Sequence, residues 1–192
     1  MTIHRCSWAN PKNPRYIAYH DEEWGLPCRD ELRLFEMLNL EGAQAGLSWE
    51  TILNKRESYR QAFDGWDARL IAAYDDARIA ELLANPGIVR NRLKVNAAVT
   101  NARAYLRLVA EGGSLAELLW GYVDGKPIVN RIDQQGDRPA RTELSDRISR
   151  DLGKRGFKFV GSTIIYAYMQ GIGMVNDHDL ACFRHRECQR SA

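Results

Sequence analysis

The sequence has 192 residues, a formal net charge of +2, and 45% hydrophobic and 27% charged residues. These values are typical of a soluble globular chain and exclude long disordered, low-complexity or collagen-like segments. No apolar run approaches the roughly 20 residues of a membrane-spanning helix, and residues 1–8 lack the apolar core of a signal peptide. We therefore expect a cytoplasmic protein with no membrane partner, folded as a single unit over residues 1–192.

The spacing of apolar residues predicts helices and no strands, so the predicted fold class is all-α. Helices are expected over residues 30–40, 48–63, 67–73, 75–84, 90–110, 115–122, 145–154 and 162–172. Several helix starts are predicted from side chains that cap helices well, namely Ser48, Asp67, Asp75 or Asp76, Ser114, Ser145 and Ser162. Residues 123–142 contain several Gly, Pro and Asp residues and are expected to form a long loop.

Residues 79–92 read as a short helix, a tight turn and the start of a long helix. Pro86 disfavours helix at Asn85, and Gly87 tolerates positive φ, so the chain is expected to turn here. Such a hairpin can point backbone N–H groups and a helix N-terminus at a phosphate without reading any base. An ordinary connection between two packed helices is the alternative.

Basic residues are concentrated in two parts of the chain. Residues 88–110 contain no Asp or Glu but carry Arg90, Arg92, Lys94, Arg103 and Arg107. A second cluster comprises Arg147, Arg150, Lys154, Arg155 and Lys158. Clusters of this kind can bind phosphates, although two solvated helix faces explain them equally well.

Aromatic residues gather in the first quarter of the chain, where the sequence has Trp8, Tyr16, Tyr19, Trp24 and Trp49. Glu41 follows the apolar helix predicted over residues 30–40 and opens a glycine-containing stretch. Aromatic rings can stack on a base extruded from DNA while a carboxylate reads its polar edge. The positive charge of an alkylated purine adds a cation–π contribution. Ordinary packing aromatics and an exposed carboxylate at a helix end would give the same composition.

Cysteine and histidine residues near both ends of the chain form a possible metal site. His178 and Cys182 are four residues apart and would project from one face of a helix. With Cys6 and His20 they would make a Cys2His2 set for tetrahedral Zn²⁺. No CxxC pair is present, so other ligands remain open at this point, namely His4, Cys28, His185 and Cys188.

Taken together, these segments resemble the 3-methyladenine DNA glycosylase I family, a helix-hairpin-helix group of bacterial repair enzymes. The resemblance begins at residues 5–8 and 16–25 and continues through residues 34–49. It extends through residues 87–92, 101–105 and 154–161 and closes at residues 175–178. It therefore covers the chain from Cys6 to about Cys182.

The resemblance implies an all-α helix-hairpin-helix glycosylase domain joined to a zinc-bound lobe formed by the N- and C-terminal segments. The helix-hairpin-helix lobe is expected at roughly residues 50–125. One structural Zn²⁺ per chain is implied, with ligands that match Cys6, His20, His178 and Cys182. The implied partner is double-stranded DNA containing alkylated purines, and the implied solution state is a monomer.

The activity implied by the resemblance is hydrolysis of the N-glycosidic bond of 3-methyladenine, with 3-methylguanine as a second candidate base, to leave an abasic site. Glu41 matches the catalytic-site carboxylate that hydrogen-bonds the methylated base. The matching substrate-binding residues are Trp49 and Tyr16 for stacking, Tyr19, Trp8 and Trp24 for the pocket wall, and Gly46 and Leu47 for the loop that fills the gap in the duplex.

Most helix-hairpin-helix glycosylases carry a catalytic Asp shortly after the hairpin, and this family lacks it. The absence of any acid between residues 88 and 110 agrees with that exception. No lysine matches a Schiff-base nucleophile, so a monofunctional hydrolase is expected. The alternatives are a non-catalytic, zinc-stapled DNA-damage-binding protein and a helical scaffold with no DNA role.

Overall fold

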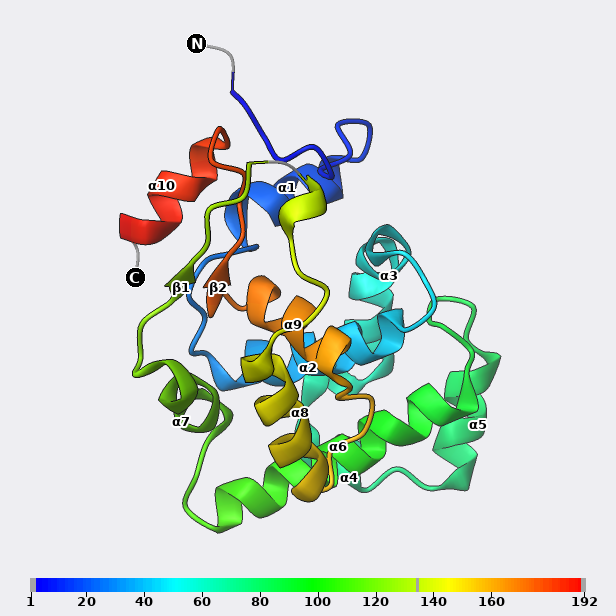
Figure 1. Cartoon of the computed structure of the whole chain (residues 1–192). Coiled ribbons are helices and arrows are strands. Elements are labelled where there is room, and N and C mark those ends of the chain that lie inside the picture. The colour runs from blue at the N-terminus through cyan, green and yellow to red at the C-terminus, as the bar shows by residue number, and fades with distance from the viewer. Residues whose placement is uncertain (1–2, 134, 191–192) are drawn as a thin grey trace.

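The computed structural model describes residues 3–133 and 135–190, and most of them lie in helices (Figure 1). The α-helices are α1 (Pro14–Glu22), α2 (Glu31–Gln44), α3 (Trp49–Ala62), α4 (Ala68–Ala72), α5 (Asp76–Ala84), α6 (Arg92–Ala110), α7 (Leu115–Trp120), α8 (Glu143–Lys154), α9 (Ser162–Gly171) and α10 (Phe183–Arg190). Short 3-10 helices are η1 (Asp64–Trp66), η2 (Gly121–Val123) and η3 (Gln135–Asp137). The predominantly helical class predicted from the sequence is confirmed.

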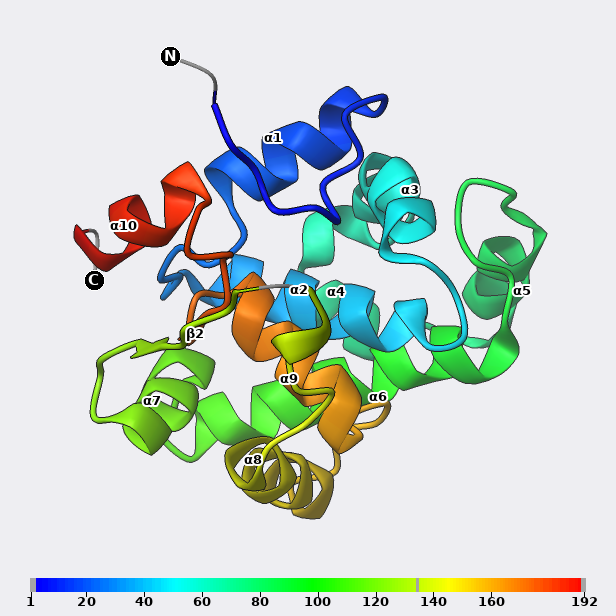
Figure 2. The ribbon, with the colours of Figure 1, turned by 45° about the horizontal axis from the view of Figure 1, so that its top comes forward.

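Helix α2 lies at the centre of the fold. Its residues from Leu34 to Ala43 are all buried, as expected for a helix surrounded by other elements. Helices α3, α6, α7 and α9 all pack against it. Figures 1 and 2 show α9 crossing close to α2 from both viewpoints, with α8 and α6 below. Side chains from several helices can therefore meet around the C-terminal half of α2, which is buried.

The described N-terminal and C-terminal segments lie side by side. In Figures 1 and 2 the N-terminal segment, α1 and α10 occupy the same end of the molecule. The amide N–H of Phe183 donates to the carbonyl oxygen of His4 over 3.0 Å. The amide of Ser7 donates to the Asp179 carboxylate over 3.3 Å. Terminal segments that would otherwise fray are thus held against each other.

Two short strands depart from the prediction that the chain has none. Strands β1 (Ile128–Val129) and β2 (Val175–Asn176) pair in parallel, with Ile128 opposite Val175. Helices α1 and α10 were also not predicted. Each strand has only two residues, and the pairing joins segments far apart in sequence. A strand this short has no alternation of apolar and polar residues by which the sequence could reveal it.

Most predicted helix starts are confirmed. The side chains of Ser48, Asp67, Asp75 and Ser114 each accept a hydrogen bond from a backbone N–H in the first turn. Two predicted caps are wrong. Helix α8 is capped by Thr142, and Ser145 is its partner in a reciprocal capping box. Helix α9 begins at Ser162 itself, after Gly161. Among the described residues, no helix is long and apolar enough to cross a membrane.

Candidate active site and metal centre

A cavity of about 190 Å³ opens between α1, α2, α3 and α9. This volume is smaller than the roughly 300–1,000 Å³ of sites that take drug-sized ligands, and it suits a single planar ring system. We call it the aromatic pocket, and its lining residues are Trp8, Tyr16, Tyr19, Trp24, Glu41, Gln44, Trp49, Arg138, Ala167 and Gln170.

Glu41 provides the only carboxyl group among the described residues that line the aromatic pocket. It lies in the last turn of α2 and is 4% exposed. Desolvation by burial raises the pKa of Glu41 to about 8, and its carboxyl makes no hydrogen bond to another described residue. The buried Glu41 carboxyl group can therefore accept a hydrogen bond from a ligand or pair with a positive charge on it.

The predicted aromatic residues meet around this carboxyl group. The rings of Tyr19 and Trp49 lie 5.2 Å apart between centroids, inclined by 47°. Among the other lining rings, Trp8 lies 5.5 Å from Tyr16 and 4.7 Å from Trp24 between centroids. Burial raises the pKa of the Tyr19 hydroxyl well above its usual value, so this group stays neutral. The pocket thus combines aromatic faces with one buried acid, which suits a flat, electron-poor ligand.

Gly46 and Leu47 do not line the aromatic pocket. They lie in the loop of residues 45–48 between α2 and α3, which we call the pocket loop. Gly46 has a φ of +77°, and a Cβ built there would have no atom within 4 Å. Leu47 is 41% exposed. The structure therefore places these two residues at the surface, between the helix that carries Glu41 and the helix that begins at Trp49.

Four lining residues were not predicted, namely Gln44, Arg138, Ala167 and Gln170. Arg138 follows η3, and its Nε donates to the carbonyl oxygen of Asp177 over 2.9 Å. Its guanidinium also pairs with the Asp179 carboxylate, while its Nη1 is buried without a hydrogen-bond partner. Gln170 donates to the Asp177 carboxylate over 2.7 Å. Arg138, Ala167 and Gln170 reach the pocket through tertiary contacts that no local sequence pattern indicates. Gln44 lies one turn after Glu41 on α2, and this helical spacing could have identified it.

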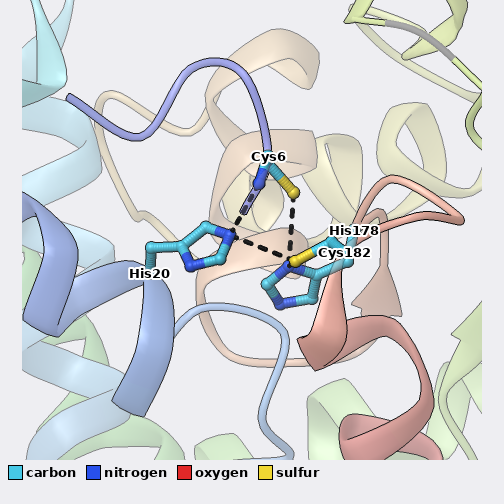
Figure 3. Close-up of side chains that lie close together, drawn as sticks. All are labelled: Cys6, His20, His178 and Cys182. Atoms are coloured by element: carbon cyan, nitrogen blue, oxygen red, sulfur yellow. Dashed lines mark hydrogen bonds between the residues drawn. The ribbon is translucent and has the colours of Figure 1, made fainter. Parts of the chain in front are cut away.

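The four predicted metal ligands come together at the end of the molecule where the termini meet (Figure 3). Their ligand atoms lie within 4.8 Å of one another, and all four residues are buried. The Sγ of Cys6 is 3.4 Å from Nδ1 of His178. The Sγ of Cys182 is 3.5 Å from Nε2 of His20 and 3.6 Å from Nδ1 of His178.

These distances fit a tetrahedral metal site. Bonds of about 2.3 Å to sulfur and 2.0–2.1 Å to nitrogen separate tetrahedral sulfur and nitrogen ligands by about 3.6 Å. The second nitrogen of each imidazole is also engaged, with His20 Nδ1 at 2.7 Å from Asp21 and His178 Nε2 at 2.9 Å from the carbonyl oxygen of Trp24. Such contacts fix the orientation of imidazole ligands in metal sites.

The other cysteine and histidine residues lie outside this group. His4 is exposed and Cys28 is half-buried. His185 Nε2 lies 3.1 Å from the carbonyl oxygen of Asn130, and Cys188 is buried near Gly25. Among the described residues, the group with suitable spacing is therefore Cys6, His20, His178 and Cys182.

The predicted hairpin consists of α5, a turn at residues 85–91 and the start of α6. The Asn85 side chain accepts the amide N–H of Gly87 over 2.7 Å, and the Asn91 side chain caps α6. Arg90 and Arg92 are exposed at this end of the helix.

The remaining cations of residues 88–110 donate to backbone carbonyl groups. Lys94 Nζ contacts the carbonyl oxygens of Ala43 and Ala45. Arg103 donates to Ala72, and Arg107 donates to Arg155. The hairpin end of α6 therefore presents two exposed arginines that make no hydrogen bond to another described residue, rather than a continuous basic stripe.

Comparison with known proteins yields a family match over nearly the whole chain. Residues 8–185 match the family model described as methyladenine glycosylase. The chain is 46% identical over 180 residues to DNA-3-methyladenine glycosylase 1 of Escherichia coli K12, covering 94% of this chain and 96% of that protein.

Solved structures agree with this match. A crystal structure of 3-methyladenine DNA glycosylase I superposes with a TM-score of 0.92 at 48% identity, covering 94% of this chain and 98% of that one. A Staphylococcus aureus 3-methyladenine DNA glycosylase I, studied for its recognition of 3-methyladenine, gives a TM-score of 0.90 at 35% identity, covering 95% and 97%.

Proposed function

This chain belongs to the methyladenine glycosylase family, and we propose that it removes 3-methyladenine from alkylated duplex DNA by hydrolysing the bond between base and sugar. The observation that carries this proposal is the buried Glu41 carboxyl group, enclosed by aromatic rings in a cavity of about 190 Å³. A base inside an intact duplex cannot reach such a site, so the damaged nucleotide must be extruded from the stack first.

Recognition of the base follows from the charge of the damaged nucleotide. A purine alkylated at N3 is a cation in DNA, so it stacks favourably against Trp49 and Tyr16. Because burial raises the pKa of Glu41 to about 8, its carboxyl holds a proton at neutral pH. A cationic base favours the carboxylate form, which accepts a hydrogen bond from the exocyclic amino group. Guanine presents an acceptor oxygen there, so 3-methylguanine should be the weaker substrate.

The reaction needs little covalent help from the protein. The bond between C1′ and the purine nitrogen breaks, and its electron pair neutralises the positive charge of the departing base. Water bonds to C1′ and releases a proton, which leaves an abasic site in an intact strand. Glu41 stabilises the positive charge that develops at the sugar. No lysine is among the described residues that line the pocket, which supports a monofunctional hydrolase.

DNA binding is proposed for the helix-hairpin-helix lobe, roughly residues 50–125. The N-terminus of α6 and the exposed Arg90 and Arg92 suit contacts with phosphates. Gly46 and Leu47 are proposed to enter the gap that the extruded base leaves, because they are exposed beside the pocket. The other helices form a second lobe together with the terminal segments.

The Cys6, His20, His178 and Cys182 group is proposed to bind one structural Zn²⁺ per chain. Two thiolates, two imidazoles and spacings near 3.6 Å suit this ion. Four protein ligands leave no open position, so the ion stabilises the fold and takes no part in hydrolysis. A monomer is proposed because one chain supplies every residue of both sites, and the DNA substrate favours a cytoplasmic location.

The test is release of bases from duplex DNA treated with dimethyl sulfate, with the products separated by chromatography. The wild-type protein should release 3-methyladenine, and Glu41→Gln should release far less. Glu111→Gln is the matched control, since this carboxyl is exposed at the far end of α6. If the wild-type protein binds the duplex but releases no base above background, a damage-binding protein without catalysis becomes the better interpretation.

A further inference from the structure

Lys94 occupies the first turn of α6, at the base of the hairpin, yet its ammonium group is turned into the protein. Its Nζ donates to the carbonyl oxygens of Ala43 over 2.8 Å and Ala45 over 2.6 Å. A cation in the first turn opposes the helix dipole of α6, so its position is not explained by the stability of that helix. Desolvation also lowers the pKa of Lys94. The helix dipole and desolvation both disfavour the positive charge of Lys94, and its hydrogen bonds to the two carbonyl groups offset that cost.

The carbonyl groups that Lys94 contacts belong to the last turn of α2 and the first residue of the pocket loop. Carbonyls at a helix C-terminus have no intrahelical donor, and a cation is a favourable partner for them. The other hydrogen bonds of the loop are local, such as Leu47 N–H to the Gln44 carbonyl oxygen. Among the described residues, the two bonds from Lys94 are the only hydrogen bonds that join residues 43–48 to a distant part of the chain.

Helix α3, which follows the pocket loop in the chain, makes direct contacts with the hairpin turn. Lys55 donates to the carbonyl oxygen of Pro86 over 2.7 Å, and the Tyr59 hydroxyl accepts the N–H of Val89 over 3.1 Å. Gly87 packs so closely that a Cβ there would lie 2.9 Å from Cβ of Ser58. The hairpin turn is therefore joined to α3, which begins at Trp49, by several direct contacts. Among the described residues, the hydrogen bonds that join the pocket loop and the last turn of α2 to the hairpin come from Lys94.

We propose that Lys94 is a positioning residue that couples the hairpin to the pocket loop. When the hairpin docks on the DNA backbone, Lys94 holds Ala45 in place, so that Gly46 and Leu47 stand ready to enter the duplex as the base leaves. This inference rests on the proposed function. Lys94 donates to neither Glu41 nor Trp49, and both of these residues lie within helices, so binding of a free base should not require the two hydrogen bonds of Lys94.

The test compares Lys94→Met, which keeps the length of the side chain and removes its donors, with Lys94→Arg, which keeps a cation and several donors. Arg29→Met is the matched control, because Arg29 also donates to a backbone carbonyl, that of Gly125 over 2.8 Å. This contact lies near α7, at the opposite end of the molecule from α5 (Figures 1 and 2). Thermal melting establishes that each variant is folded.

The first readout is the single-turnover rate of 3-methyladenine release at saturating protein. Because displacement of positioning groups by about 1 Å can cost up to about 100-fold, we expect Lys94→Met to lose about tenfold or more. Its affinity for free 3-methyladenine should stay at the wild-type value. Lys94→Arg should recover most of the rate, and Arg29→Met should match the wild type. A parallel loss of free-base affinity in Lys94→Met would overturn the inference, because it would mean that the pocket itself had changed.

The second readout needs no catalysis and separates this inference from the proposed activity. An undamaged duplex is titrated while the NMR signals of the Gly87, Gly46 and Leu47 amides are followed. In the wild type all three should respond. In Lys94→Met the Gly87 signal should still respond, and the signals of Gly46 and Leu47 should not. An unchanged response of Gly46 and Leu47 in this variant would overturn the coupling, whether or not the wild-type protein releases a base.

Discussion

The imidazole of His178 packs edge-on against the indole of Trp24, with ring centroids 4.6 Å apart and an interplanar angle of 84°. His178 belongs to the metal-ligand group, and Trp24 lines the aromatic pocket. Trp8 makes a similar contact on the same wall, 5.1 Å from the His20 ring. The candidate metal ligands His20 and His178 therefore pack directly against two aromatic residues of the pocket wall.

Removal of the metal should accordingly weaken both the fold and the pocket. We expect one zinc per chain by elemental analysis of the purified protein, and none in His178→Ala. Binding of a structural metal contributes directly to the free energy of folding, and each kcal/mol lost should lower the melting temperature by about 2–4 °C for a domain of this size. The affinity for free 3-methyladenine should fall as well, because Trp8 and Trp24 lose their support.

Cys188→Ser is the control for this experiment, since Cys188 is a buried cysteine outside the ligand group. It should retain the metal. Equal melting temperatures for the chelated and untreated proteins would contradict a structural role of the ion.

Glu41 should make the stability of the protein fall as pH rises. Its pKa is raised from 4.5 to about 8 by burial, so between these values the folded protein keeps a proton that the unfolded chain has released. Unfolding then releases a proton, and the free energy of unfolding decreases with pH across this window. At about 1.4 kcal/mol per pH unit, the loss is on the order of 3–5 kcal/mol by pH 9.

The measurement is denaturant unfolding of the wild type and Glu41→Gln from pH 5 to pH 9. The amide of the variant does not ionise, so its stability relative to the wild type should grow steadily between pH 5 and pH 8. Glu111→Gln should run parallel to the wild type. Parallel curves for Glu41→Gln would show that the carboxyl group titrates normally in the folded protein.

The sequence predicted those parts of the fold that depend on local chemistry. Side-chain oxygens at Ser48 and Ser114 satisfy helix N–H groups within three residues, so a short window of sequence is enough to place these starts. Helix α1 carries a similar signal, since Asn13 caps it and Pro14 stands at its first position. Helix α1 was missed although this signal was present.

The pocket residues that were predicted come from two short segments, residues 8–24 with their four aromatic side chains and residues 41–49 with Glu41 and Trp49. Spacing alone left the metal ligands undecided, because Cys6 and Cys182 meet only when the termini pack together. Arg138 was missed for the same reason. It reaches the pocket from a loop, and the segment that orients it, Asp177 to Asp179, lies about forty residues further along the chain.

The ion pair between Arg138 and Asp179 should be needed for the stability of this wall. Both side chains are nearly buried, at 11% and 10% exposed. Arg138→Met leaves the Asp179 carboxylate without its cation, and an uncompensated charge at such a site costs about 3–5 kcal/mol. Denaturant unfolding should show a loss of this order. The double variant Arg138→Met/Asp179→Asn should regain part of the stability, and an additive loss in the double variant would argue against coupling.

The salt dependence of duplex binding tests the assignment of the hairpin. Arg90 and Arg92 are exposed at the N-terminal end of α6, whereas Arg103 on the same helix already donates to the carbonyl oxygen of Ala72 over 2.9 Å. Each phosphate contact adds about 0.9 to the slope of log K against log salt concentration. Arg92→Ala should therefore reduce the slope by about that amount, measured by fluorescence anisotropy with an undamaged duplex. Arg103→Ala should leave the slope unchanged. Equal slopes for the wild type and Arg92→Ala would place the phosphate contacts elsewhere, and binding without salt dependence would favour a scaffold with no DNA role.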